Sequence, residues 1–265
     1  MSRYKRNREL PNWDPNQYLK FAVERTQPSI DLAKRINTDN PKTVIDIGCG
    51  PGNSTHALME RWPDAKLTGL DSSRTMIEKA KQDYPDCEWI IGDASTFQFG
   101  REYDVVFSNA ALQWMPDHES LVPRLFTAVA SGGALAVQVP ADQGSHIRRS
   151  MIEVAARMKW SRYTSGCEKL MNYRSAEYYY DIAAPLCRRF ELWETTYHHV
   201  LESQAAVVEW YKATGMKPFL ERLPDDGARK EFEDEVLAGC KGDYEIRPNG
   251  KVLYPFRRIF FIAYK

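Results

Sequence analysis

The sequence has no net charge, no long apolar run and no closely spaced cysteines. Its 36 basic and 36 acidic residues cancel, so no overall field draws the chain to nucleic acid or to an anionic membrane. No window holds the roughly 18 apolar residues of a membrane span, and no apolar segment follows the charged start MSRYKRNREL. We therefore expect a cytoplasmic protein without nucleic-acid or membrane partners.

The five cysteines are odd in number and far apart, and none forms a C-x-x-C pair (Cys49, Cys87, Cys167, Cys187 and Cys240). This spacing predicts free thiols rather than zinc or redox chemistry, and no metal site is expected. No repeat or low-complexity tract divides the chain. We expect one domain over residues 1–265 with no obligate protein partner.

Strand and helix patterns alternate through the first half of the chain. The expected strands are TVIDIG (43–48), KLTGLD (66–71), CEWIIGD (87–93), YDVVFSN (103–109) and GALAVQV (133–139), with helical patterns at 54–62, 72–84 and 118–130. Because only crossover connections return a strand in the same direction, this order predicts a parallel sheet with helices on both faces. Residues 43–140 are thus expected to form a doubly wound α/β core.

The second half is mainly helical and ends in two strands. Helices are expected at 145–160, 175–190 and within 203–240, a loop at 161–174, and a tight hairpin at Asn249-Gly250. Residues 191–201 and 257–265 are expected to complete the same sheet. Residues 141–190 and 202–250 would then form a helical cap over its carboxyl edge, and residues 1–42 an N-terminal helical lid.

A glycine loop follows the first strand, at the sheet edge where ligands bind in such folds. Gly48 and Gly50 allow a sharp turn and a close approach of ligand to backbone, and Asn53, Ser54 and Thr55 offer capping groups to the next helix. A dinucleotide fingerprint places its third glycine one residue later than this chain does. A nicotinamide oxidoreductase is therefore the least favoured enzyme class.

Carboxylates end the second and third strands. Asp71 lies about 20 residues after the loop, where its oxygens can accept from both hydroxyls of a ribose. Asp71 can also serve as a helix N-cap without losing that role. Asp93 suits an exocyclic adenine amine, and the N–H of Ala94 suits the ring. These features together indicate a nucleoside site.

The stretches VIDIGCGPGNST, GLDSSRTMI and GDAS resemble the nucleoside-binding elements of class I S-adenosylmethionine-dependent methyltransferases. That family has a Rossmann-like, seven-stranded, mostly parallel sheet with an antiparallel last pair. The resemblance implies S-adenosyl-L-methionine as cofactor and S-adenosyl-L-homocysteine as product. It places at the cofactor Asp46, Gly48, Gly50, Asn53, Asp71, Ser72, Asp93 and Ala94.

A longer resemblance spans WDPNQYLKFAVERTQPSIDL, NAALQWMPDH, TTYHHV, WYKATGMKPFL and RRIFFIA. These stretches are similar to the trans-aconitate methyltransferase family, which methylates a carboxylate of small tri- or dicarboxylic acids. The resemblance implies that Tyr18, Phe21 and Arg25 fold over the cofactor and that Asn109 faces its methionine end. The family typically has Arg-Pro where this chain has Lys217-Pro218, which bears on the choice of acid.

The implied reaction needs positioning rather than a base, because a carboxyl group with a pKa of about 4 is ionised at neutral pH. No catalytic dyad is predicted, and the resemblance places Gln113 and Trp114 near the transferred methyl. Arg258 is the best candidate cation for a polyanionic acid, whereas Arg257 points to the opposite sheet face.

The remaining substrate candidates are Lys217 and one strand of alternating side chains. Of His198 and His199 only one can face the ligand, and we expect Tyr197 and His198 at the substrate. The tyrosines of YRSAEYYYD (173–181) fit a packed helix surface, although their hydroxyls can reach a carboxylate. Two alternatives stay open: methylation of a hydroxyl, amine or carbon nucleophile, and a noncatalytic cofactor-binding module.

Overall fold

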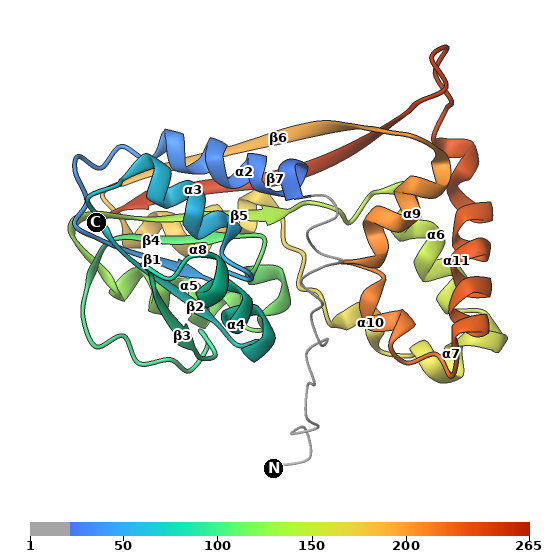
Figure 1. Ribbon diagram of the computed structural model, residues 1–265, viewed down its shortest axis with the longest axis horizontal. Helices are drawn as coiled ribbons and strands as arrows, with labels where there is room; N and C mark the ends of the chain where they lie inside the picture. The colour runs from blue at the N-terminus through green and yellow to red at the C-terminus, as the bar shows by residue number, and fades with distance from the viewer. Residues whose placement is uncertain (1–21) are drawn as a thin grey trace.

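The computed structural model describes residues 22–265, and its centre is one seven-stranded sheet (Figure 1). The strands are β1 (Thr43–Ile47), β2 (Lys66–Asp71), β3 (Glu88–Ile91), β4 (Tyr103–Asn109), β5 (Val129–Pro140), β6 (Arg189–Leu201) and β7 (Val252–Tyr264). Their order is β3-β2-β1-β4-β5-β7-β6. The first five are parallel, and β7 pairs antiparallel with both β5 and β6. This confirms the doubly wound sheet with an antiparallel last pair.

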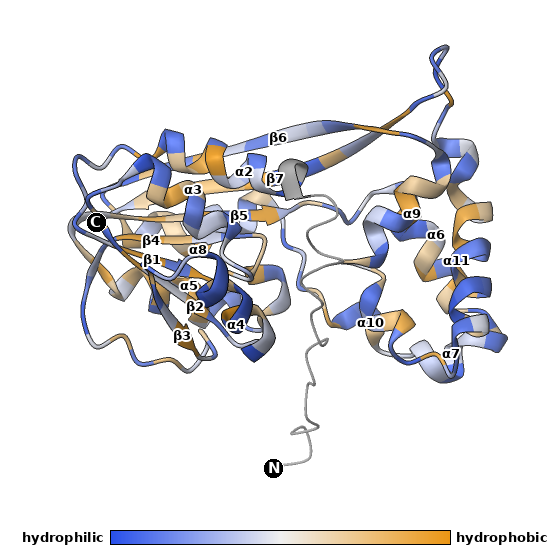
Figure 2. Cartoon of the chain, viewed as in Figure 1, coloured by the Kyte–Doolittle hydropathy of each residue, from blue (hydrophilic) through white to orange (hydrophobic). Residues whose placement is uncertain are grey.

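Helices cover both faces of the sheet because successive strand residues point to opposite sides. On β4, Val105 packs with α2 (Ala22–Arg35) and α3 (Asn53–Arg61), whereas Val106 packs with α5 (His118–Thr127) and α8 (Ala176–Ala183). The helix α4 (Arg74–Asp83) packs on β2 and β3. In Figure 2 the central strands such as β5 are drawn mainly in hydrophobic colours, whereas the edge strand β6 is mainly white to blue and the helices carry both colours. The apolar core therefore lies on both sides of the sheet.

A second group of helices, the cap, lies beside the sheet in Figure 1. It contains α6 (His146–Ala155), α7 (Met158–Thr164), α9 (Gln204–Lys212), α10 (Lys217–Leu220) and α11 (Asp226–Cys240). Its own core includes Trp160, Trp210 and Phe232. The long strand β7 joins the two parts, because Tyr254 belongs to the cap core and Phe260 to the sheet core. The cap is thereby fixed beyond the carboxyl end of β5.

Several expected boundaries were wrong in the second half. Residues 161–174 are not all loop: α7 runs to Thr164, whose hydroxyl donates to Ala155 O (2.9 Å), and a 3-10 turn spans Cys167–Lys169. The expected helix at 175–190 ends at Ala183, because Pro185 lacks an N–H, and a 3-10 turn follows over Ala184–Leu186. Within the stretch expected to form the cap, α8 packs on the sheet instead.

The turn at Asn249-Gly250 is confirmed, but the strand after it is longer than expected. Gly250 has φ +80° and its N–H donates to Arg247 O (2.8 Å). Beyond the turn, one bridge joins Ile246 to Val252, and β7 then pairs with β6 from Val252 onward. A strand that reaches from cap to sheet explains why β7 begins before residue 257.

Within residues 22–265, no helix is long and apolar enough to cross a membrane. The same part of the chain has no cluster of three or more histidine, cysteine or acidic side chains that would hold a metal ion. All five cysteines are free thiols, and Cys49, Cys167 and Cys240 are buried.

Candidate active site

One large pocket opens between the carboxyl edge of the parallel strands and the cap. The described residues surround an empty volume of about 1490 Å³, which includes the open solvent at its mouth. Its lining contains twelve of the residues expected from the sequence: Arg25, Gly48, Gly50, Asn53, Asp71, Ser72, Asp93, Ala94, Asn109, Gln113, Trp114 and Arg258.

The glycine loop forms one wall of the pocket, and Gly48 and Gly50 have different structural roles in it. Gly48 has φ +71°, and a Cβ placed there would lie 2.2 Å from the Ala111 Cβ. Gly50 has φ +55°, and a Cβ there would meet nothing within 4 Å. Gly48 is therefore required by packing against the turn after β4, whereas Gly50 leaves bare backbone at the pocket.

Asp46 supports this loop from behind and does not line the pocket. It is fully buried, and its Oδ2 accepts hydrogen bonds from the hydroxyls of Ser54 (2.6 Å) and Thr55 (2.7 Å). The expected side-chain cap of α3 was therefore wrong, because Gly52 is the N-cap and these hydroxyls point to Asp46. Burial raises the pKa of Asp46 to about 6, against the lowering effect of both hydroxyls.

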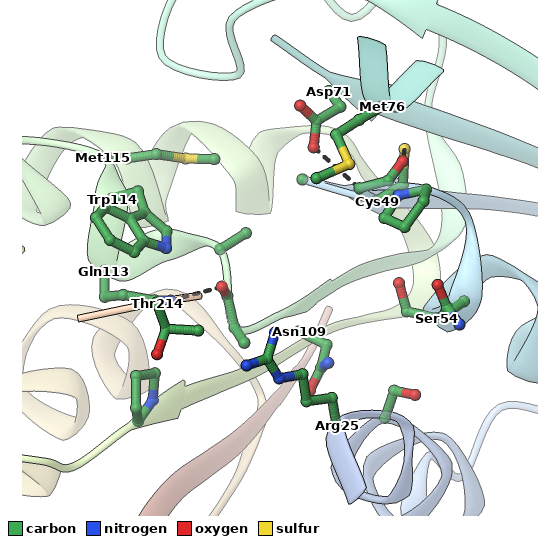
Figure 3. Close-up of a pocket in the computed structure, with 18 of the residues that line it drawn as sticks. Arg25, Cys49, Ser54, Asp71, Met76, Asn109, Gln113, Trp114, Met115 and Thr214 are labelled. Atoms are coloured by element: carbon green, nitrogen blue, oxygen red, sulfur yellow. Dashed lines mark hydrogen bonds between the residues drawn. The ribbon is translucent and has the colours of Figure 1, made fainter. Parts of the chain in front are cut away.

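Asp71 closes the same loop from the end of β2. Its Oδ2 accepts from Gly50 N–H (2.9 Å, the dashed contact in Figure 3) and its Oδ1 from Ser73 N–H (2.8 Å). Burial raises the pKa of Asp71, against these backbone hydrogen bonds. Each carboxylate oxygen has about two acceptor sites, so each retains one for a ligand hydroxyl. This geometry fits a ribose diol.

The end of β3 completes a nucleoside-shaped edge. Asp93 accepts through Oδ1 from the N–H (2.9 Å) and hydroxyl (2.7 Å) of Ser95, which fixes its side chain. Its Oδ2 and the N–H of Ala94 make no hydrogen bond within residues 22–265, and both residues line the pocket. A carboxylate acceptor next to a backbone donor matches the amine and ring nitrogen of adenine.

Arg25 and Asn109 lie at the centre of the pocket, where sheet and cap meet. Arg25 extends from α2 toward Asn109 in Figure 3, and its Nη2 donates to Trp210 O on α9 (3.2 Å). Its guanidinium also lies 5.2 Å from the Trp210 ring centroid. The Oδ1 of Asn109 is buried and has no hydrogen-bond partner among the described residues. An acceptor in that position fits a ligand ammonium or hydroxyl.

The turn after β4 carries Gln113 and Trp114 into the pocket. Gln113 donates through Nε2 to Ala110 O (2.5 Å), and its buried Oε1 has no partner among residues 22–265. Sequence reasoning missed the two residues that hold the turn. His118 Nε2 lies 2.7 Å from Leu112 O, and Asn172 N–H donates to Gln113 O (2.6 Å).

The sequence offers a motif that could have identified His118 as a residue of the site, but none that could have identified Asn172. His118 ends the NAALQWMPDH stretch quoted above. Its pKa is lowered, with burial as the largest cause, and the Tyr179 hydroxyl lies 3.0 Å from its Nδ1. A neutral ring that donates from Nε2 to a backbone carbonyl and accepts at Nδ1 satisfies all these contacts. Asn172 comes from a distant loop that only the fold brings near.

Arg258 presents a buried positive charge from β7. Its residue surface is 4% exposed, Nη1 donates to Gln138 Oε1 on β5 (3.1 Å), and its guanidinium lies 4.7 Å from the Phe256 ring centroid. Arg257 points the other way, toward Glu194 at 3.8 Å on the outer surface. The alternation expected for these two arginines is confirmed.

Three other expected substrate residues do not line the pocket. Tyr197 is half-buried and donates its hydroxyl to Asp31 on α2 (2.6 Å). His198 is exposed, so the expectation that His198 rather than His199 points inward was wrong. Its neighbour His199 is the buried one, stacked on Trp210 with centroids 4.3 Å apart. Burial, with Arg258 and Arg25 nearby, lowers the pKa of His199 to about 4.

Lys217 lies on α10 with its ammonium 3.5 Å from Glu221, outside the described pocket lining. Tyr18 and Phe21, expected over the cofactor, lie outside the described residues.

The cap contributes polar residues that the sequence analysis did not predict to lie together. Tyr173 and Tyr211 line the pocket, and the Tyr211 hydroxyl donates to the buried Asp142 (2.5 Å). Burial raises the pKa of Asp142 to about 6, opposed by Tyr211, Ser145 and the nearby charges of two arginines. These residues lie far apart in the sequence, and only packing of the cap brings them together.

The pocket therefore has two chemically different halves. Among the lining residues that the structure describes, the carboxylates are Asp71 and Asp93, both on the nucleoside side. The other half offers Arg258 and two tyrosines, and no imidazole or carboxylate in the described lining. Such a half suits an anion, and within residues 22–265 its lining offers no imidazole or carboxylate as a general base for a neutral nucleophile.

Comparisons with known proteins show similarity to methyltransferases. A family model described as a methyltransferase domain matches residues 44–133. The chain is 41% identical over 254 residues to a trans-aconitate 2-methyltransferase from Azoarcus sp. (strain BH72), with 96% of this chain and 99% of that one covered. A trans-aconitate 2-methyltransferase from Rhodopseudomonas palustris (strain BisA53) is 42% identical over 261 residues, covering 97% of this chain and all of that one.

A solved structure shares the fold at low identity. It is the phosphoethanolamine N-methyltransferase 2 of Haemonchus contortus in complex with phosphomonomethylethanolamine and S-adenosylhomocysteine. The TM-score is 0.58 and the identity 17%, over 94% of this chain and 57% of that one.

Proposed function

The chain belongs to the trans-aconitate 2-methyltransferase family, and we propose that it uses S-adenosylmethionine to methylate a carboxylate of a small polycarboxylic acid, with trans-aconitate as first candidate. The observation that carries the proposal is the pairing, in one pocket, of a nucleoside cradle with the buried cation Arg258. The products would be a monomethyl ester and S-adenosylhomocysteine.

The residues at the cradle fit the cofactor. Asp71 would hold the ribose hydroxyls, Asp93 and Ala94 the adenine, and the bare backbone at Gly50 would allow close approach. The unpartnered Oδ1 of Asn109 would accept from the ammonium of the methionine part. When bound, S-adenosylmethionine would supply a methyl group on its sulfonium sulfur. The oxygen of an ionised carboxylate would bond to that methyl carbon as the carbon–sulfur bond breaks and S-adenosylhomocysteine leaves, and no base would be needed.

The other half of the pocket would bind and orient the acid. Arg258 is held by Gln138 and by the ring of Phe256, so its charge faces the pocket at little cost in side-chain entropy. Gln113 and Trp114, on a turn fixed by His118, would position the reacting carboxylate. Positioning of this kind is worth roughly 7–11 kcal/mol when reacting atoms are held near contact distance.

The described lining also favours a carboxylate over a hydroxyl or amine nucleophile. A neutral nucleophile must lose a proton, and no carboxylate or imidazole lines the acid-binding half within residues 22–265. A carboxylate is already ionised near neutral pH. The cap would then serve mainly to exclude water. Water stabilises the separated charges of the reactants, so its exclusion favours the reaction.

We assign the parts of the chain accordingly: residues 43–140 to cofactor binding, the cap helices to substrate, and α2 with the preceding residues to a lid. Arg25 supports a link between lid and cap, since it donates to Trp210 O. A cytoplasmic location would suit the five free cysteines, because disulfides are rare in that compartment.

A methyl-transfer assay with labelled S-adenosylmethionine tests the proposal, using trans-aconitate, cis-aconitate, isopropylmalate, citrate and simple monoacids. We expect a base-labile monomethyl ester from at least one polycarboxylic acid. Arg258→Ala should raise the KM of that acid about ten- to hundredfold, as expected for loss of a hydrogen bond to a charged group. Arg257→Ala, on the outer face, is the matched control and should leave this KM unchanged.

Equal effects of Arg258→Ala on the acid and on the cofactor would remove Arg258 from the substrate site. Cofactor binding without ester formation from any acid would contradict the proposed reaction.

A further inference from the structure

Two tyrosines line the acid-binding half of the pocket, and their hydroxyl hydrogens have different partners. Tyr211 donates to the Asp142 carboxylate at 2.5 Å. Tyr173 donates to the thioether sulfur of Met171 at 3.2 Å. A carboxylate is a strong acceptor and a thioether a weak one. An anion entering the pocket would therefore displace Met171 from Tyr173, whereas Tyr211 is already committed to Asp142.

The loop that carries Tyr173 is fixed to the turn where the methyl group is expected. The adjacent residue Asn172 donates its N–H to Gln113 O (2.6 Å) and its Nδ2–H to Met115 O (2.8 Å). Two hydrogen bonds from one residue hold the loop and the turn at a set distance. A ligand contact made by Tyr173 would thus be preorganised relative to the reacting group.

The surroundings of Tyr173 favour an anion. The Arg148 guanidinium lies 4.5 Å from its ring centroid, and burial raises the pKa of Tyr173, so the hydroxyl remains a donor at neutral pH. Asp142 acts electrostatically on both Arg148 and Arg258. Together with Arg25, which also lines the pocket, these two arginines outnumber the one ionised aspartate, so positive charge exceeds negative charge around this half of the pocket. An excess of positive charge suits a further carboxylate on the acid.

We propose that Tyr173 is a specificity-determining residue, whose hydroxyl donates to a carboxylate of the acid other than the one that is methylated. Arg258 supplies positive charge in the same pocket, and Asp142, which accepts from Tyr211, offsets part of the positive charge there. The inference rests on the proposed function. It predicts that the enzyme prefers acids with at least two carboxylates over monoacids of similar size.

The test is Tyr173→Phe, which keeps the ring that faces Arg148 and removes the donor. We expect the KM of trans-aconitate to rise about ten- to hundredfold, since a hydrogen bond to a charged group is lost. Turnover at saturation and the Kd of S-adenosylhomocysteine should stay within about twofold of wild type. Tyr180→Phe, at an exposed position on α8, is the matched control and should change neither value.

The ratio of kcat/KM for trans-aconitate to that for the monoacid crotonate separates specificity from structure. If Tyr173 has only a structural role, Tyr173→Phe should lower kcat/KM for trans-aconitate and for crotonate by the same factor, and this result would overturn the inference. The proposed role predicts that Tyr173→Phe lowers the ratio of the two. An unchanged KM in an active Tyr173→Phe enzyme overturns the inference and leaves the proposed function standing. No ester from the wild-type enzyme with any acid overturns both.

Discussion

Replacing Asp71 by asparagine should weaken cofactor binding while keeping the side-chain shape. In the wild type each carboxylate oxygen accepts one backbone N–H, from Gly50 at 2.9 Å and from Ser73 at 2.8 Å, and retains one acceptor site. The amide keeps one oxygen and replaces the other by an NH₂ group, which cannot accept. One ribose hydroxyl therefore loses its acceptor, and one backbone N–H of the loop loses its partner.

The two losses affect different quantities. The ribose hydrogen bond to a charged group is worth about 1.5–3 kcal/mol, so the Kd of S-adenosylhomocysteine should rise roughly 10- to 150-fold. The loop hydrogen bond is lost in the free protein as well, and it should lower the free energy of unfolding by about 1 kcal/mol. Calorimetric titration measures the first quantity and urea unfolding the second.

Asp83→Asn is the matched control, because Asp83 lies on the surface of α4 and contacts Lys79 at 2.5 Å. It should leave the Kd of S-adenosylhomocysteine unchanged. The 2′-deoxy analogue of S-adenosylhomocysteine adds a second check, since it should lose affinity for the wild type and much less for Asp71→Asn. A Kd for Asp71→Asn within twofold of wild type would refute the ribose assignment.

Two further predictions concern stability. Gly48→Ala should destabilise the fold by about 2–4 kcal/mol, because its Cβ would lie 2.2 Å from the Ala111 Cβ at a φ of +71°. Gly144→Ala, where a Cβ would enter open space, is the control. Equal melting temperatures of the two variants would contradict the packing argument. Burial raises the pKa of Asp142 from 3.8 to about 6, so between these pH values the unfolded chain releases a proton that the folded chain keeps. The Asp142 share of the free energy of unfolding should thus fall by roughly 2 kcal/mol as pH rises from about 4 to 6. Asp142→Asn should remove this share in urea unfolding and leave that of Asp46, and an unchanged pH dependence would be evidence against the assignment.

The sheet and the nucleoside half of the pocket were predictable because both depend on short local patterns. Buried parallel strands are apolar on both faces, and the loop of Gly48 and Gly50 directly follows one of them. Asp71 and Asp93 come at strand ends, where parallel strands share one edge. Each of these signals lies within a few residues of the element that it marks.

The acid-binding half was only partly predictable because packing of the cap creates it. Arg258 was identified from its strand, but Asp142, Tyr173 and Tyr211 meet through contacts between distant segments. Strand alternation requires that one of two adjacent histidines faces inward, yet it does not say which one. The packing of β6 against α9 decides it, because His199 stacks on Trp210.

The central claim is that a carboxylate oxygen of a small polycarboxylic acid receives the methyl group. The most direct measurement is the NMR spectrum of the product formed from trans-aconitate and S-adenosylmethionine labelled with carbon-13 at the methyl group. We predict a single new methoxy signal that correlates through three bonds with one carbonyl carbon of the acid. A methyl group attached to carbon, or no labelled acid at all in the presence of bound cofactor, would contradict the account.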